Sequence, residues 1–125
     1  MEMNIPEVRA EVEPAFAAYE AALVGNDIAA LMALFWDDPR AVRYGIGENL
    51  YGAAEIAAFR QARSPVGLGR RLSRTVITTF GYDLATASTL FHRDNLAGKV
   101  GRQMQTWVRL PRAGWRIVAA HVSVI

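Results

Sequence analysis

The sequence predicts an α+β domain in which N-terminal helices pack on one face of a curved antiparallel sheet. Apolar residues recur at helical spacing through the first half of the chain, whereas the second half consists of β-rich runs separated by short, turn-rich links. Because helices must cover one face of such a sheet, the two patterns together favour a layered arrangement. The 125 residues contain no repeat and no linker, so we expect a single domain over residues 1–125.

The first half of the sequence predicts three helices. The first should end near Gly25, and Pro14 should kink it or divide it. Asn26 is placed to cap a second, short helix, which the Asp38–Pro39 step should end. The third should span residues 52–63. The face of the first helix that should enter the core carries Val12, Phe16, Tyr19 and Leu23.

The second half predicts four long strands. They are rich in β-branched and aromatic residues, and the links between them contain glycine, proline and asparagine. Such short links between long strands indicate an antiparallel meander. A shorter strand, residues 41–46, should lie between the second and third helices. The long strands are expected at residues 71–80, 84–93, 100–110 and 115–124.

The last of these strands carries apolar residues on both faces. Strict alternation places Trp115, Ile117, Ala119, His121 and Ser123 on one face, and Arg116, Val118, Ala120, Val122 and Val124 on the other. The helices can cover only one face of the sheet. We therefore expect a second copy of the chain to cover the other face, in a homodimer.

Polar side chains on these elements are the first candidates for a site. Gln103 and Gln105 share a strand face with a tryptophan, which suits either a polar pocket or a wet interface. His121 lies near the deep end of an otherwise apolar row, where it would be a structural residue or a catalytic base. Arg60 and Arg63 adjoin the apolar stripe of the third helix, so they would lean over one end of the core or remain solvated.

The composition excludes several classes of function. Hydrophobic residues make up 52% and charged residues 21%, as in globular proteins. The absence of cysteine excludes disulfides, thiolate metal sites and cysteine nucleophiles, and it fits a cytoplasmic location. We see no signal peptide and no membrane span, and so expect no membrane partner. The two histidines lack a metal-ligand spacing and no nucleotide-binding glycine pattern occurs, so we expect no metal and no cofactor.

The basic residues are almost all arginine, with Lys99 the single lysine. This bias admits a small anionic ligand, because a guanidinium group binds carboxylate or phosphate through parallel hydrogen bonds. A GC-rich genome would produce the same bias. The arginines are scattered among acidic residues rather than gathered in a stripe, which argues against a nucleic-acid partner.

Three segments carry a resemblance to a known family. They are GAAEIAAFRQAR at residues 52–63, GRQMQTWVR at residues 101–109 and GWRIVAAHVS at residues 114–123. Together they resemble the AtzH-like family, which includes the oxalurate-catabolism protein HpxZ and lies within the SnoaL-like, nuclear transport factor 2-like superfamily. The resemblance extends from Val12 to Ser123. It implies a cone-shaped fold with a cavity between helices and sheet, and a dimer.

The resemblance also implies an activity. One branch of the family is described as a decarboxylating amidohydrolase of carboxylated ureas such as 1,3-dicarboxyurea, with an essential tyrosine on the first helix and an essential arginine on the first strand. By position these match Tyr19 and Arg43. Strand alternation alone would turn Arg43 toward solvent if its neighbours Val42 and Tyr44 faced the core. The resemblance implies that Arg43 faces inward.

Three hypotheses about function result. In the first, the protein hydrolyses a small carboxylated amide or ureide: Arg43 binds a carboxylate, Tyr19 acts as a hydrogen-bond donor or acid, and water is the nucleophile. The second is a ligand-binding or accessory protein of a pathway amidase. The third is a ketosteroid-isomerase-like enzyme, which requires a carboxylate in the pocket; Glu48 and Asp94 are conceivable, although the pattern places no acid there clearly. Further substrate contacts in the first hypothesis are Arg63, Arg71, Gln105 and His121, with His121 as the base.

Overall fold

The computed structural model describes residues 1–125, and it contains three α-helices and a six-stranded sheet. The helices are α1 (Pro6–Val24), α2 (Ile28–Leu34) and α3 (Ala53–Ala62), and a 3-10 turn, η1, spans Asp94–Leu96. The strands are β1 (Val42–Tyr44), β2 (Asn49–Tyr51), β3 (Arg71–Phe80), β4 (Leu84–His92), β5 (Gly101–Leu110) and β6 (Gly114–Val124). None of the helices is long and apolar enough to cross a membrane.

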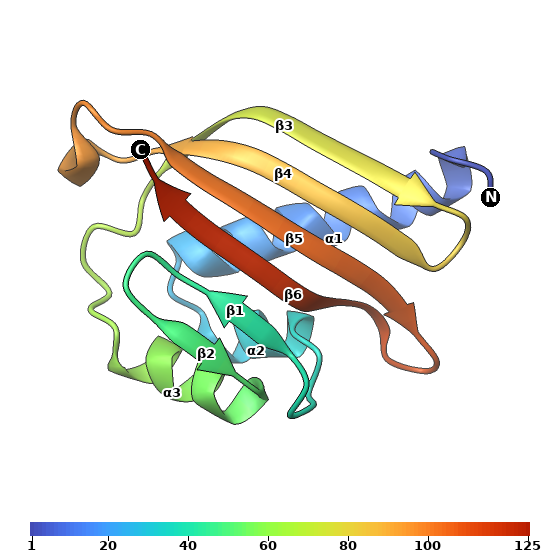
Figure 1. The fold of residues 1–125 in the computed structure, drawn as a ribbon, viewed down its shortest axis with the longest axis horizontal. Helices are drawn as coiled ribbons and strands as arrows, with labels where there is room; N and C mark the ends of the chain where they lie inside the picture. Colours follow the sequence, from blue (N-terminus) through green and yellow to red (C-terminus); the bar gives the residue numbers. More distant parts are fainter.

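The sheet has the strand order β2-β1-β6-β5-β4-β3 (Figure 1). The antiparallel meander predicted for the second half of the chain is confirmed, since β3, β4, β5 and β6 pair in sequence order. Strand β1 extends this meander by pairing with β6 in parallel, and β2 adds to β1 antiparallel. The sequence did not predict the parallel pair or β2.

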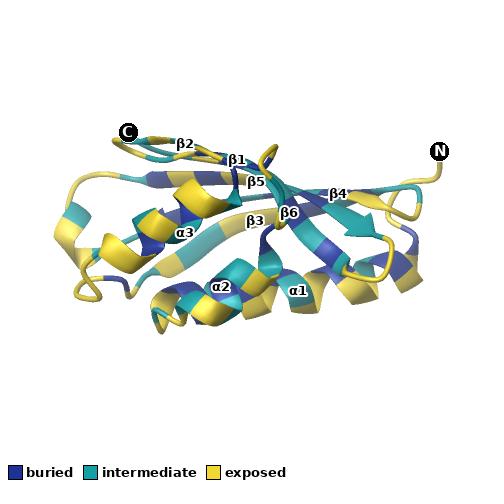
Figure 2. Cartoon of the chain, turned by 90° about the horizontal axis from the view of Figure 1, so that it is seen from below, coloured by how far each residue is buried: buried dark blue, intermediate teal, exposed yellow.

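All three helices lie on one side of the sheet, as expected from the layered pattern (Figure 2). Pro14 lies on the exposed side of α1, which continues through it as one helix, so the expected division is wrong. Asp27 rather than Asn26 caps α2, because its carboxylate accepts a hydrogen bond from the Ala30 amide at 3.1 Å. The chain becomes extended at Phe35, four residues before Pro39.

The core lies between α1, α2 and the inner face of the sheet. Two tryptophans anchor it: Trp107 and Trp115 are both buried, and their indole N–H groups donate to Gln105 Oε1 at 2.9 Å and Glu11 Oε1 at 2.8 Å. The apolar face predicted for the first helix is also buried. The core residues from that helix are Val8, Val12, Phe16, Tyr19, Ala22 and Leu23.

A β-bulge in β6 changes which residues face the core. Thr106 pairs with Ala119 and Trp107 pairs with Ile117, so Val118 is an extra residue opposite the β5 ladder. Beyond it the two faces are exchanged: Ala120 is buried on the inner face, and His121 is exposed on the outer face. The uninterrupted alternation predicted for this strand is therefore wrong, both for the row that contains His121 and for the apolar row that contains Ala120.

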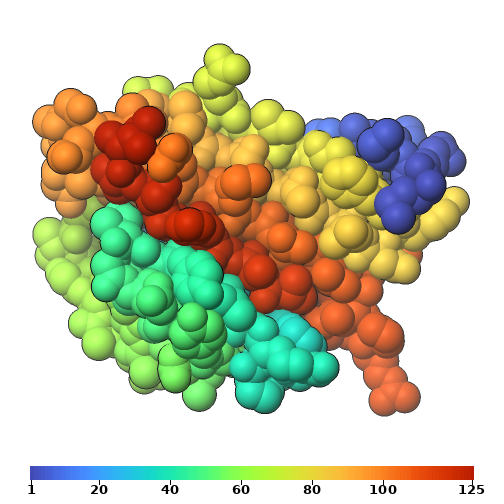
Figure 3. All heavy atoms as spheres, in the orientation of Figure 1, coloured from blue at the N-terminus to red at the C-terminus, as the bar shows by residue number.

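No helix covers the outer face of the sheet, which Figure 3 shows from the front. Large side chains remain exposed on it, including Met104 (59%), Val76 (57%) and Tyr44 (37%). An apolar outer face is thus present, although it is formed by other residues than those predicted from β6. The homodimer remains a prediction.

Candidate functional site

A cavity of about 190 Å³ lies beneath the sheet, between α1, the end of α3 and the inner faces of β1, β4, β5 and β6. Its walls combine aromatic and aliphatic residues with several arginines and one carboxylate. The lining residues are Tyr19, Leu23, Arg43, Ile46, Glu48, Phe59, Arg63, Arg70, Phe91, Arg93, Gln103 and Val122. A larger groove of about 960 Å³ beside α2 and α3 is mainly apolar and lacks such a cluster of polar groups, so the smaller cavity is the better candidate for chemistry.

Arg43 enters the cavity from β1. It pairs across the sheet with Ala120 on the inner face, and only 6% of it is exposed. Its Nη1 donates to Glu48 Oε1 at 3.1 Å, and its guanidinium lies 5.2 Å from the centre of the Phe59 ring. A Cβ atom on Gly45 would lie 1.8 Å from Glu48 Oε1. Glycine at this position therefore makes room for the carboxylate that holds Arg43.

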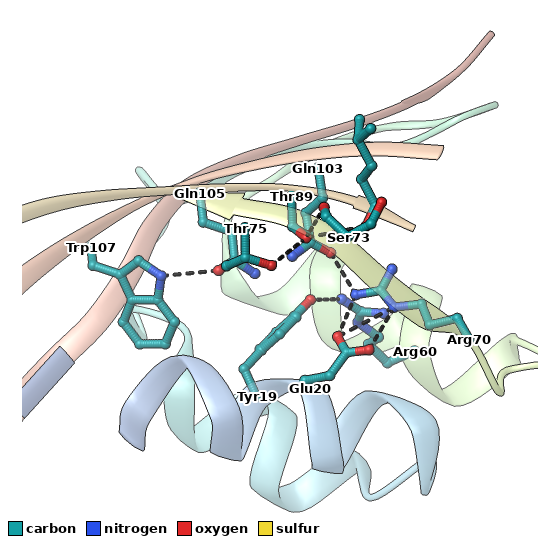
Figure 4. A network of polar contacts seen from close by, with 11 residues as sticks. Tyr19, Glu20, Arg60, Arg70, Ser73, Thr75, Thr89, Gln103, Gln105 and Trp107 are labelled. Carbon is teal, nitrogen blue, oxygen red and sulfur yellow. Dashed lines mark hydrogen bonds and ion pairs between the residues drawn. The ribbon is translucent and has the colours of Figure 1, made fainter. Parts of the chain in front are cut away.

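Arg70 enters from the segment just before β3, and Glu20 of α1 holds it (Figure 4). The contact is bidentate: Arg70 Nη2 donates to Glu20 Oε1 at 2.6 Å and Nε donates to Oε2 at 2.9 Å. Arg70 Nη2 also donates to Gln103 Oε1 at 2.8 Å. The side chain is only 2% exposed, and its guanidinium lies 4.6 Å from the centre of the Phe91 ring. Such a pair holds both side chains in one geometry.

Tyr19 projects from α1 toward α3, and its ring packs edge-on against Phe35 with centroids 6.0 Å apart. Its hydroxyl oxygen accepts a hydrogen bond from Arg60 Nη2 at 2.6 Å (Figure 4). Arg60 is fully buried, and burial lowers its pKa to about 10. It stands behind the cavity wall, next to Tyr19, and pairs with no carboxylate.

The electrostatic balance of the cavity favours an anion. Arg63 and Arg93 complete a group of five arginines with Arg43, Arg60 and Arg70, while Glu20 and Glu48 are the two carboxylates paired to this group. Burial, followed by the charge of Arg43, lowers the pKa of Arg63; burial, followed by the charge of Arg70, lowers the pKa of Arg93. Both shifts mean that the protonated, charged forms of Arg63 and Arg93 are less favourable in the cavity than in water.

Many donors of this group have no partner within the protein. The buried nitrogens without a hydrogen bond include Arg43 Nε, Arg60 Nε and Nη1, Arg63 Nε and Nη2, Arg93 Nε and Gln103 Nε2. Buried polar groups are ordinarily hydrogen-bonded, because an unsatisfied donor is costly. An anionic ligand with several oxygens would relieve both the missing hydrogen bonds and the repulsion between the arginines.

Three of the residues predicted from the sequence come together here. Tyr19, Arg43 and Arg63 all line the cavity, although they come from α1, β1 and the end of α3. Arg43 faces inward, although alternation would turn it toward solvent if Val42 and Tyr44 faced the core. Its neighbours Val42 and Tyr44 belong to the apolar outer face of the sheet, so the residue between them must face inward.

The other three predicted residues lie elsewhere. Arg71 is exposed and pairs with His92 of β4. Because neighbouring residues face opposite sides, the preceding residue, Arg70, faces the cavity instead. Gln105 is buried, but its Oε1 accepts from the Trp107 indole, and Gln103 is the glutamine that lines the cavity. His121 is exposed on the outer face, with its ring centroid 5.9 Å from that of Tyr44, because the bulge at residue 118 reverses its direction.

Glu20, Arg70 and Arg93 were missed as site residues, and Glu48 was considered only as a carboxylate for the ketosteroid-isomerase-like hypothesis. For Arg70 the register of the sheet decides the direction: Leu72 pairs with Phe91 on the inner face, and alternation from Leu72 places Arg70 on the same side as the core. Glu48 lies in a turn between two very short strands, where no periodicity exists to orient it.

A family model described as AtzH-like matches residues 1–125. The chain belongs to the AtzH-like family. This agrees with the three sequence segments that carried the resemblance. No curated protein matches the chain.

Solved structures similar to this AtzH-like protein share its fold closely. A protein of unknown function from Pectobacterium atrosepticum is 59% identical, with a TM-score of 0.95, over 98% of this chain and 94% of that chain. A cystatin-like fold protein from Burkholderia xenovorans is 55% identical, with a TM-score of 0.95, over 100% and 97% of the two chains. A nuclear transport factor 2-like superfamily protein from Salmonella enterica is 24% identical, with a TM-score of 0.76, over 94% and 90%. This last similarity shows the fold alone, and that fold is the one expected from the sequence.

Proposed function

We propose that this AtzH-like protein is an enzyme that binds a small carboxylated amide or ureide in the arginine-lined cavity and hydrolyses it. One observation carries the proposal. Tyr19 and Arg43, from distant parts of the chain, line one small cavity that has more arginines than carboxylates. An anion is the ligand for which such a cavity provides the most hydrogen bonds.

The size and the charge of the cavity support a compact substrate with two anionic ends. Its volume of about 190 Å³ equals that of roughly six water molecules at ~30 Å³ each. Arg43 and Arg63 lie toward β1 and α3, whereas Arg70 and Arg93 lie at one end of the β3–β4 hairpin, just before β3 and just after β4. Two carboxylates separated by a urea or amide group would each meet a pair of guanidinium groups. A carboxylated urea of the 1,3-dicarboxyurea type has this form, whereas oxalurate has a single carboxylate and would use one of the two arginine pairs.

The chemistry proposed is hydrolysis without a covalent intermediate. Water adds to the carbonyl carbon of the amide, while the Tyr19 hydroxyl donates a hydrogen bond to the carbonyl oxygen as negative charge develops on it. The carbon–nitrogen bond then breaks, and the nitrogen leaves with a proton. A carbamate released in this way loses carbon dioxide. Glu48, the carboxylate in the cavity wall, replaces His121 as the proposed base that removes a proton from water.

A ligand-binding role without turnover, beside a pathway amidase, is the second proposal. The contacts of Glu48 favour it: its two oxygens already accept hydrogen bonds from Arg43 Nη1 and the Gly47 amide, both at 3.1 Å, so neither oxygen is without a partner. The ketosteroid-isomerase-like hypothesis has less support, since it requires a carboxylate in an apolar site and Glu48 is paired with an arginine.

The experiment is to incubate the purified protein with 1,3-dicarboxyurea and with oxalurate, and to measure carbon dioxide and ammonia release against a protein-free control. Titration calorimetry with malonate, which cannot be hydrolysed at an amide, measures binding separately. Release that requires Arg43 supports the enzyme. Malonate binding without release supports the binding protein, and the absence of both overturns the two proposals.

A further inference from the structure

The hydrogen bond between Arg60 and Tyr19 joins two buried side chains from distant parts of the chain. Arg60 lies on α3 and Tyr19 on α1, 41 positions apart, and the Nη2 to Oη distance is 2.6 Å. Arg60 is completely buried, and Tyr19 is 3% exposed. Both partners are therefore held by the surrounding core, and their mutual orientation is fixed by packing rather than by solvent.

Arginine has only donors, so the direction of this hydrogen bond is settled. A guanidinium group offers five N–H bonds and no acceptor, whereas a tyrosine hydroxyl can donate one hydrogen bond and accept others. The Tyr19 oxygen must be the acceptor. The pKa of Arg60, lowered by burial to about 10, still leaves it a cation at neutral pH, so it cannot become an acceptor there.

The proton of the Tyr19 hydroxyl must then point away from Arg60. The contact with Arg60 is the one hydrogen bond that this hydroxyl makes within the protein, and Tyr19 lines the cavity that Arg60 does not reach. We propose that Arg60 is a positioning residue, which fixes Tyr19 as a hydrogen-bond donor toward an oxygen of the ligand in the cavity. This inference rests on the proposed function, because it concerns the same ligand.

The cost of Arg60 supports a functional reason for it. A buried cation without a carboxylate partner is unfavourable, and Arg60 Nε and Nη1 have no hydrogen-bond partner. An apolar side chain of similar length would fill the same space between the helices and the sheet without this cost. The charge has a second effect on the neighbour it contacts: it polarises the phenol oxygen, so the O–H group becomes a stronger donor.

The orientation of the hydroxyl can be tested without any ligand. Tyrosine labelled with ¹³C at Cζ reports the hydrogen bonding of the hydroxyl by NMR, and the chain has only four tyrosines, so Tyr19→Phe assigns the signal. Arg60→Gln introduces an acceptor to which the hydroxyl can donate, and we expect its Tyr19 signal to move. Arg60→Lys, which also has only donors, should leave the signal near that of the wild type. Signals that are the same in all three proteins would overturn the proposal.

The effect on the ligand is tested by a double-mutant cycle with malonate. Arg60→Gln should weaken malonate binding about 10-fold when Tyr19 is present, but less than about 2-fold in the Tyr19→Phe background. Equal losses in both backgrounds would show that Arg60 acts through stability or charge alone, and would overturn the proposal. Should Arg60→Gln fail to fold, as judged by circular dichroism, Arg60→Met takes its place in the cycle and is judged by the same criterion, because methionine removes the donor to Tyr19 and keeps much of the packing. If the wild type neither binds malonate nor releases carbon dioxide and ammonia from the proposed substrates, the proposed function fails, while the NMR comparison still decides the orientation of Tyr19.

Discussion

Gly101 lies directly against the ring of Phe91, its partner on the neighbouring strand. A Cβ atom at position 101 would be 2.2 Å from Phe91 Cε2 and Cζ, closer than any real contact. The Phe91 ring in turn supports two cavity arginines, since the guanidinium carbons of Arg70 and Arg93 lie 4.6 Å and 5.2 Å from its centre. The absence of a side chain at residue 101 therefore helps to set the position of two positive charges.

Gly101→Ala should displace the Phe91 ring, which is 1% exposed, toward the cavity that it lines. We expect a loss of about 1–3 kcal/mol in the free energy of unfolding, as for other overpacked cores, and several-fold weaker malonate binding. Chemical denaturation and calorimetry measure the two effects. Gly47→Ala is the matched control, because a Cβ there meets nothing within 4 Å. Equal behaviour of the two variants would contradict the role given to Phe91.

Arg43→Lys should remove most of any hydrolysis of a carboxylated urea while the fold survives. Lysine cannot reproduce the parallel hydrogen bonds of a guanidinium group to a carboxylate. Tyr19→Phe should reduce turnover more than binding, because its hydroxyl acts mainly as charge develops. Assays of carbon dioxide and ammonia release, with melting curves as the check on folding, measure both variants. Full activity in both would leave the binding-protein proposal ahead.

Arg63→Met should stabilise the unliganded protein and weaken anion binding at the same time. The pKa of Arg63 is lowered by burial and by the charge of Arg43, so the charge opposes folding when no anion is present. Methionine keeps much of the packing without the charge. We expect a higher Tm without malonate and about 10-fold weaker malonate affinity. Gains in both stability and affinity would show that Arg63 does not contact the anion.

Met104→Glu should dissociate the predicted homodimer. Met104 stands on the outer face of β5 with 59% of its surface exposed, and a charge there would be buried in an interface between two sheets. Val66→Glu, at an 81% exposed position in the loop before β3, is the control. Analytical ultracentrifugation at micromolar concentration gives the masses. A wild type that is monomeric under these conditions would refute the dimer.

Trp115→Ala should cost roughly 3–5 kcal/mol, since it empties a large volume in the core and leaves Glu11 without the indole donor. Trp115→Phe should cost less, because most of the ring remains. Thermal and chemical denaturation monitor both variants. A change below about 1 kcal/mol for the alanine variant would place the side chain outside the cooperative core.

The sequence predicted the layered fold because its two periodicities are long and regular. The prediction failed where a single extra residue interrupts the alternation of a strand. Alternation without the bulge at Val118 places His121 on the core side of β6. In the structure the bulge turns His121 to the outer face, where its ring contacts that of Tyr44. Nothing in the local composition marks the extra residue, which is revealed only by pairing with β5.

Only some of the site residues could be predicted, because the local pattern that orients a side chain is often too short. The inward direction of Tyr19 follows from the period of a long helix, while its role in the site came from the family resemblance; Arg63 follows from its position beside an apolar stripe. Arg43 lies on a strand of three residues, too short for a pattern to decide its direction, and the family resemblance supplied that direction. The choice between Arg70 and Arg71 depends on the register with β4, which is a property of the sheet and not of the segment.

The parallel pairing of β1 with β6 has a consequence for the order in which the protein is made. Val42, Arg43 and Tyr44 take their neighbours from residues 119–121, so the strand that carries Arg43 has only the short β2 beside it until the ribosome has synthesised nearly the whole of this sequence. Helices α1 and α2 can form much earlier, because their hydrogen bonds are local. A nascent chain stalled before β6 should thus hold Tyr19 on a formed helix while Arg43 has not yet joined the sheet. The cavity would therefore become able to bind an anion only late in translation, when β6 is synthesised and Ile117 completes the core.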